Sequence, residues 1–127
     1  MFYRLEEGDA QATVLTDLVA DCSIQELVAC FDTHEILCDV VPTFRDFQYL
    51  NKRGEANALV YCKQIFPWPF KDRDLCFHYS AVGDYVNRGV ISISQSLPIG
   101  SSYFGTVVPS EGSRLERMDF KYMYNIF

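Results

Sequence analysis

The strongest constraint on this fold is a two-residue hydrophobic period that begins near Thr43 and recurs in successive short segments. Such alternation places one side of a segment in a core and the other in water, which is typical of antiparallel strands. Turn residues separate the segments, notably at residues 52–55 and 83–84. The predicted strands span residues 44–50, 57–66, 74–82, 90–97 and 117–127. We therefore expect a meander of consecutive antiparallel strands.

A strand and two short helices are predicted ahead of this meander. Residues 13–20 are rich in β-branched side chains and alternate in part, so they predict a strand. Ser23 and Glu26 have the spacing of a capping box. An apolar stripe at helical spacing follows at Ile24, Leu27, Val28 and Phe31. With a second helical piece at residues 34–38, the order favours an α+β fold, with helices against one face of a curved antiparallel sheet.

Length and composition limit the classes of protein that fit. A chain of 127 residues buries about two-thirds of its unfolded surface, which suffices for one core, so we expect a single domain over residues 1–127. Hydrophobic residues make up 49% of the chain, which excludes disorder as the main state. Eleven basic against 17 acidic side chains give a net charge of −6, so nucleic acid is not an expected partner.

The cysteines bear on the cellular compartment. They are odd in number and none belongs to a C-x-x-C pair, and the first residues lack the basic and apolar regions of a secretory signal. We therefore expect five free thiols and a cytoplasmic location. The cysteines are Cys22, Cys30, Cys38, Cys62 and Cys76. The apolar runs fall far below the roughly 18 residues that a membrane helix needs.

A proline-rich corner lies between two of the predicted strands. Pro67 and Pro69 flank Trp68 and impose a rigid extended bend in place of a tight hairpin. Arg73 and Asp74 open the next strand, where a guanidinium can tie a carboxylate or loop carbonyls at the sheet rim. We therefore expect Arg73 to be hydrogen-bonded, and Trp68 to be at least partly shielded from water.

The segment PWPFKDRD resembles the Pro-x-Pro-x-x-x-Arg-Asp element of the START family, the lipid-transfer domains related to the steroidogenic acute regulatory protein. The following LCFHYSAV resembles the hydrophobic strand that comes next in the family. Weaker, collinear similarities extend to SIQELVACF, VISISQSL and ERMDFKYMYNIF. The resemblance covers nearly the whole chain, with one specific motif and several generic ones.

The resemblance implies a helix-grip fold, in which a curved antiparallel sheet wraps a C-terminal helix and encloses a tunnel for one lipid. It also implies a C-terminally truncated domain, because the family's last strands and closing helix have no counterpart after Phe127. The implied partners are a lipid (a phospholipid, a sterol or a related class) and, transiently, a membrane surface. No cofactor is implied. An uncovered concave face would favour self-association of the chain.

The strand period also nominates residues that would line such a tunnel. We expect one face of the sheet to carry Val60, Cys62, Gln64, Leu75, Phe77, Tyr79, Ile91, Ile93 and Gln95. The pattern fits an ordinary core as well as a ligand-lined cavity. In a cavity, Gln64, Tyr79 or Gln95 would orient the polar end of the ligand. The opposite faces, which should meet water, carry Lys63, His78, Ser80, Ser92, Ser94 and Ser96. A charged sterol clamp is not expected, because Val60 and Tyr79 occupy the positions where similar sterol-binding members place a buried acid and base.

Other classes of function compete with lipid binding. Cys76 and His78 share a strand face, but no Asp or Asn is placed to orient the imidazole, so we expect no enzyme. The chain lacks the paired ligand spacings of structural zinc sites, so no metal is expected. A regulatory or scaffolding role, as a lipid-sensing domain of a larger multidomain protein, remains an alternative. A hydrolase of related helix-grip architecture is a weaker one.

Overall fold

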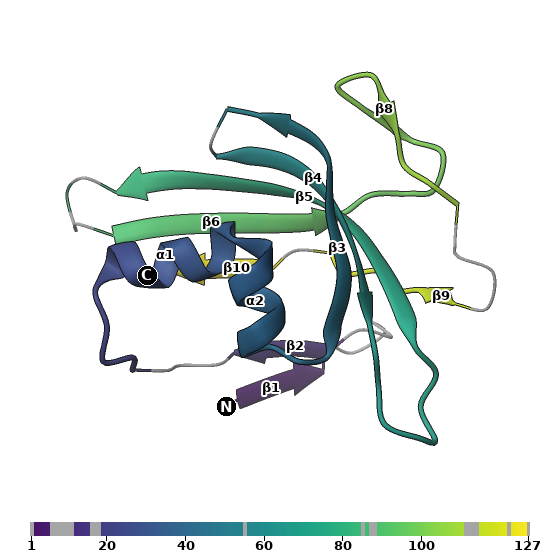
Figure 1. Cartoon of the computed structure of the whole chain (residues 1–127), viewed down its shortest axis with the longest axis horizontal. Helices are drawn as coiled ribbons and strands as arrows, with labels where there is room; N and C mark the ends of the chain where they lie inside the picture. The colour runs from purple at the N-terminus through teal and green to yellow at the C-terminus, as the bar shows by residue number, and fades with distance from the viewer. Residues whose placement is uncertain are drawn as a thin grey trace.

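The computed structural model describes residues 2–5, 12–15, 19–54, 56–84, 86, 89–110, 115–121 and 123–126. The described chain is α+β, with a strongly curled, largely antiparallel sheet and two short helices, α1 (Ile24–Asp32) and α2 (His34–Val40) (Figure 1). The main sheet contains β3 (Phe44–Arg53), β4 (Asn57–Gln64), β5 (Arg73–Asp84), β6 (Gly89–Ser96), β9 (Glu116–Arg117) and β10 (Met123–Ile126). Two small sheets pair β1 (Phe2–Leu5) with β2 (Ala12–Leu15), and β7 (Ser102–Tyr103) with β8 (Thr106–Val107).

The strand order β10–β6–β5–β4–β3 confirms the predicted antiparallel meander. The single strand predicted over residues 117–127 is wrong, because the chain pairs twice. It first runs parallel to β5 as β9, and then crosses to the outer edge of β6 as β10. At the crossing, the Ser96 hydroxyl donates to the Phe120 carbonyl at 2.8 Å and accepts from the Phe120 amide at 3.0 Å. These two hydrogen bonds hold the end of β6 where the ladder changes partner.

Irregularities in β3 contribute to the curl of the sheet. Its register against β4 shifts between Arg45 and Gln48, and again between Tyr49 and Asn51. Asp46, in the first irregular stretch, has a φ of 51°. Extra residues of this kind bend a strand and increase its twist. The alternation visible in the sequence therefore does not continue evenly along β3.

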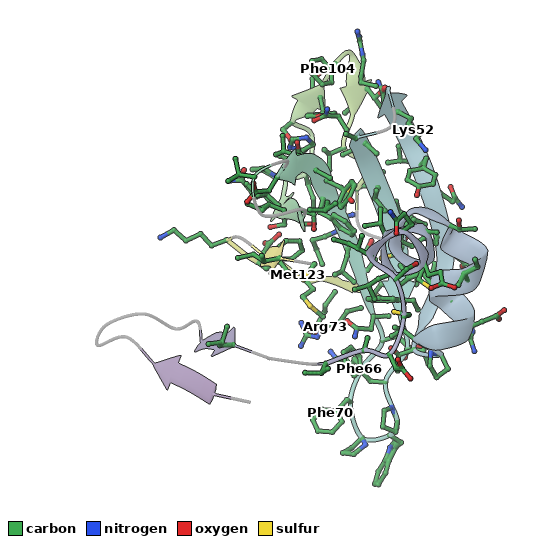
Figure 2. The ribbon with its side chains drawn as sticks, turned by 90° about the vertical axis from the view of Figure 1, so that its left-hand side faces the viewer. Lys52, Phe66, Phe70, Arg73, Phe104 and Met123 are labelled. Atoms are coloured by element: carbon green, nitrogen blue, oxygen red, sulfur yellow. The ribbon has the colours of Figure 1, made fainter. Side chains whose placement is uncertain are left out.

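The two helices lie on one side of the curled sheet (Figure 1). The predicted capping box is confirmed: the Ser23 hydroxyl accepts from the Glu26 amide, and the Glu26 carboxylate accepts from the Ser23 amide at 2.8 Å. As expected, α1 contacts the sheet, at β6, while α2 contacts β3. The predicted strand at residues 13–20 corresponds to β2 only up to Leu15, and residues 16–18 lie outside the described part of the chain. In Figure 2, β1 and β2 lie to one side of the main sheet.

Residues that pair across antiparallel strands share a face of the sheet, so the register divides β4, β5 and β6 into two faces. We call the side of α1 and α2 the helix face. It carries Ala58, Val60, Cys62, Gln64, Arg73, Leu75, Phe77, Tyr79, Ala81, Val90, Ser92, Ser94 and Ser96. We call the other side the hairpin face. It carries Asn57, Leu59, Tyr61, Lys63, Asp74, Cys76, His78, Ser80, Val82, Asp84, Ile91, Ile93 and Gln95.

The β7–β8 hairpin and its flanks cover part of the hairpin face. Leu59, Cys76 and Val108 form a fully buried cluster, against which Leu97 and Tyr103 also pack. This cluster joins Leu59, in the middle of the sheet, to Val108, which lies 49 residues further along the chain. A hydrophobic core therefore lies between the sheet and the hairpin, on the side away from the helices.

The tip of the hairpin is an unusual two-residue turn. Phe104 and Gly105 have φ values of 46° and 85°, the positive pair that a type I′ hairpin turn requires. Glycine adopts such a conformation readily, but phenylalanine does so at a cost. The Phe104 ring lies under the Arg53 guanidinium at 4.6 Å and against the Tyr103 ring at 4.4 Å. These contacts offset the backbone strain and fix the hairpin to β3.

Candidate ligand-binding surface

The register overturns one part of the predicted ligand surface. Tyr79 lies opposite Ser94, whereas Ile93 lies opposite Ser80. Ile91, Ile93 and Gln95 therefore belong to the hairpin face, and the expectation that all nine residues share one face is wrong. The strand period grouped Gln95 with the two isoleucines, and the apolar character of the isoleucines assigned the group to this face. The pairing of Asp84 with Gly89 sets the register of β6, and a change of one residue exchanges the two faces of a strand.

The other six predicted residues do share the helix face, but their exposure differs. Val60, Cys62 and Leu75 are buried in the core. Gln64, Phe77 and Tyr79 are half-buried. Of the six, only these last three offer surface to a ligand in this conformation. Phe77 also packs against the Phe120 ring, with 5.8 Å between centroids.

The serines of β6 were missed as site residues. Ser92 and Ser94, which were expected to face water, are buried on the helix face. Ser94 lies between Tyr79 of β5 and Met123 of β10 in the ladder, so a serine and a tyrosine are cross-strand neighbours on this face. Counting outward from the turn between β5 and β6 would have identified the serines, because a four-residue connection pairs Asp84 with Gly89.

The two faces of β4, β5 and β6 differ in the number of charged side chains that they carry. Over β4, β5 and β6, the helix face carries one charged side chain, Arg73, at the end of β5. The hairpin face of the same strands carries Lys63, Asp74 and Asp84. The helix face therefore consists of apolar side chains with a few hydroxyl, thiol and amide groups. Such a surface can bind an uncharged apolar molecule without leaving a charge desolvated.

Cys76 and His78 share the hairpin face, and burial favours the neutral form of both side chains. Burial raises the pKa of the Cys76 thiol, which disfavours the nucleophilic thiolate. Burial also lowers the pKa of His78, so the imidazole is neutral near pH 7. The prediction that His78 faces water is wrong, because the ring is half-buried and stacks on Tyr103 at 4.5 Å. On the other face, burial raises the pKa of Cys62 to about 12, and the nearby Cys38 of α2 adds to the rise.

A buried ion pair connects β5 to β9. The Arg117 guanidinium donates to both carboxylate oxygens of Asp74, at 2.8 and 3.1 Å, and Nη2 also donates to the Pro109 carbonyl at 3.2 Å. Asp74 is fully buried, and the hydrogen bond to its carboxylate raises the pKa of Arg117. The partner of Asp74 is therefore Arg117, 43 residues away, and not the adjacent Arg73. This pair braces the sheet and offers no accessible charge to a ligand.

The proline-rich corner agrees with its prediction at Arg73 and differs from it at Trp68. Arg73 has a carboxylate partner, Glu116, at 3.5 Å, but the pair is partly exposed. Trp68 was expected to be shielded, and this is wrong, because its side chain is 92% exposed. The Trp68–Pro69 peptide bond is cis, and the loop extends beyond the end of the sheet, where Figure 2 labels Phe70. Beside the loop, Phe66, Phe70, Lys71 and Arg73 line a small pocket that is open to solvent (Figure 2).

Comparison of the chain with models of known families, with curated proteins and with solved structures found no significant match. Within the described residues, no three His, Cys, Asp or Glu side chains are grouped so that they could hold a metal ion. Neither α1 nor α2, nor any other helix in the described part of the chain, is long and apolar enough to cross a membrane.

Proposed function

We propose that this chain is the sheet and paired helices of a START-like, helix-grip domain that binds one lipid on the helix face without catalysis. The observation that supports this most is the nearly complete absence of charge on that face of β4, β5 and β6. Apolar burial stabilises a bound lipid by roughly 25 cal/mol per Å². A surface free of charge receives that contribution without an opposing desolvation penalty.

The polar groups of the helix face suggest how the lipid is oriented. Phe77 and Tyr79 are its half-buried aromatic side chains on β5. The Tyr79 phenol and the Ser94 hydroxyl lie on directly opposed residues of neighbouring strands. We propose that the Tyr79 phenol orients the polar end of the lipid, because Tyr79 is half-buried whereas Ser94 is buried and offers no surface. Gln64, which the sequence also nominated, lies half-buried on the same face. Gln95 is on the hairpin face, so it takes no part.

A non-catalytic role agrees with the chemistry of the hairpin face. The Cys76 thiol and the His78 imidazole are both kept neutral by burial. Both lie on the side of the sheet opposite the proposed lipid. A lipid on the helix face therefore cannot reach either group.

The test is lipid analysis of the purified protein. We expect organic extraction and mass spectrometry to recover about one lipid per protein, with one lipid class dominating. Tyr79→Phe removes only a hydroxyl on the helix face, and it should reduce the yield or change the class of lipid. Tyr103→Phe makes the same chemical change on the hairpin side and should leave the lipid unaltered. Recovery of no stoichiometric lipid would defeat the proposed function, as would equal effects of the two substitutions.

A further inference from the structure

The small pocket beside the β4–β5 loop brings together two aromatic rings and two cations. Phe66, Phe70, Lys71 and Arg73 line it. Figure 2 shows Phe66, Phe70 and Arg73 gathered at one end of the main sheet. The pocket has a volume of about 90 Å³, which is several times the space that one water molecule needs. It is therefore large enough for a small organic group, and its open side leaves room for the rest of a ligand.

A carboxylate of the chain itself lies against the two cations of this pocket. Lys71 Nζ donates to Glu116 Oε1 at 2.8 Å, and Arg73 Nη2 lies 3.5 Å from Glu116 Oε2. The two cations thus hold the two oxygens of one carboxylate, an arrangement that charge-assisted hydrogen bonds favour. Glu116 belongs to β9, 45 residues after Lys71. The cations therefore form a carboxylate site for which Glu116 is the internal occupant.

The Glu116 carboxylate can leave this site at little cost. The side chains of Lys71, Arg73 and Glu116 are 72%, 41% and 49% exposed, and exposed ion pairs contribute little to stability. Strand β9 does not depend on them, because the adjacent Arg117 is paired with the fully buried Asp74. A ligand can therefore replace the Glu116 carboxylate while β9 stays beside β5.

The charges and the aromatic walls of the pocket select the class of ligand. Asp72 lies between the two cations in sequence, and its carboxylate accepts from the Phe66 amide at 3.1 Å. With Glu116 displaced, the charges of Lys71, Arg73 and Asp72 sum to a single positive charge. This matches a carboxylate better than a phosphate monoester, which carries about −1.5 to −2 near pH 7. The rings of Phe66 and Phe70 favour a flat apolar group beside that carboxylate.

We propose that this pocket binds a small aromatic carboxylic acid, with its carboxylate between Lys71 and Arg73 and its ring against Phe66 and Phe70. The ligand carboxylate takes the position of the Glu116 carboxylate, so Glu116 acts as a competitor that weakens binding. The ligand is a soluble acid, and the site lies at the start of β5, six residues from Tyr79. Binding here is separate from the lipid proposed for the helix face and does not depend on it.

The first test is a titration of the isotope-labelled protein with benzoate, followed by the chemical shifts of the backbone amides. We expect saturable shifts concentrated at residues 65–73 and 115–117. Acetate lacks the ring and benzyl alcohol lacks the charge, so each should bind at least about tenfold more weakly than benzoate. Equal binding of acetate and benzoate would reveal an adventitious ion only and would overturn the proposal. The absence of saturable shifts at these residues would overturn it as well.

The second test repeats the benzoate titration on matched variants. Glu116→Gln removes the competing charge at nearly constant size and should tighten binding roughly threefold, because an exposed ion pair competes only weakly. Arg73→Gln removes one of the two cations and should weaken binding by at least about fivefold.

Asp46→Asn is the control for a general gain of positive charge. It frees Lys63 from its exposed ion pair, and Lys63 does not line the pocket. Asparagine also tolerates the positive φ of this position. We expect Asp46→Asn to bind benzoate as the parent does. Equal tightening in Asp46→Asn and Glu116→Gln would overturn the proposal, and so would a Glu116→Gln variant that binds benzoate no better than the parent.

Discussion

The two faces of the β4–β5–β6 sheet differ in how their side chains are used. On the hairpin face, Leu59, Asp74 and Cys76 are fully buried, and the aspartate is matched by Arg117. On the helix face, Phe77 and Tyr79 remain half-buried and nearly every side chain is uncharged. Because neighbouring residues of a strand point to opposite faces, one sheet can hold a closed core and a binding surface together. The fully buried ion pair of the sheet, between Asp74 and Arg117, therefore stabilises the hairpin face and not the helix face.

The largest expected effect is on the buried ion pair. Arg117→Leu leaves the Asp74 carboxylate buried without its guanidinium, and it should lower the free energy of unfolding by about 3–5 kcal/mol. Urea denaturation would measure the loss. Arg73→Leu is the matched control. The ion pair between Arg73 and Glu116 is partly exposed, so this substitution should hardly change the midpoint of urea denaturation. If Arg73→Leu were the more destabilising change, the brace would belong to the proline-rich corner, as the sequence alone suggested.

The next effect concerns the apolar core under the hairpin. Leu59 is fully buried against Cys76 and Val108, so Leu59→Ala should cost about 2–5 kcal/mol through lost burial and a residual cavity. Ile93 lies on the same face but is exposed, and Ile93→Ala should change stability by less than about 1 kcal/mol. Thermal and urea unfolding would give both values. Similar costs for the two variants would show that the core extends along the whole face.

The smallest expected effect is a dependence of stability on pH through His78. Burial lowers the pKa of this imidazole in the folded chain, so the unfolded chain binds more protons between the lowered value and about 6.5. Stability attributable to His78 is therefore complete above about pH 6.5, and it is lost as pH falls through the folded pKa. His78→Phe keeps a ring against Tyr103 without the titration. Its melting temperature should fall less than that of the parent between about pH 7 and about pH 5, whereas parallel curves would mean that the imidazole is not desolvated.

Local patterns in the sequence predicted much of the fold. The alternation identified β4, β5 and β6 to within a few residues, and the Ser23–Glu26 spacing identified the start of α1. These features depend on contacts between near neighbours in the chain. The shared face was predicted only in part, because the nominated residues of β4 and β5 do lie on one face and those of β6 lie on the other.

The sequence by itself determined the α+β class, the antiparallel order of the strands and the uncharged character of one strand face. The tertiary structure alone decided three further points: the face to which β6 presents its serines, the partner of Asp74, and the exposure of Trp68. Each depends on pairing between distant residues, or on whether another segment comes to lie over a side chain. Alternation and motif spacing report only on neighbours along the chain, so they carry no information about those distant contacts.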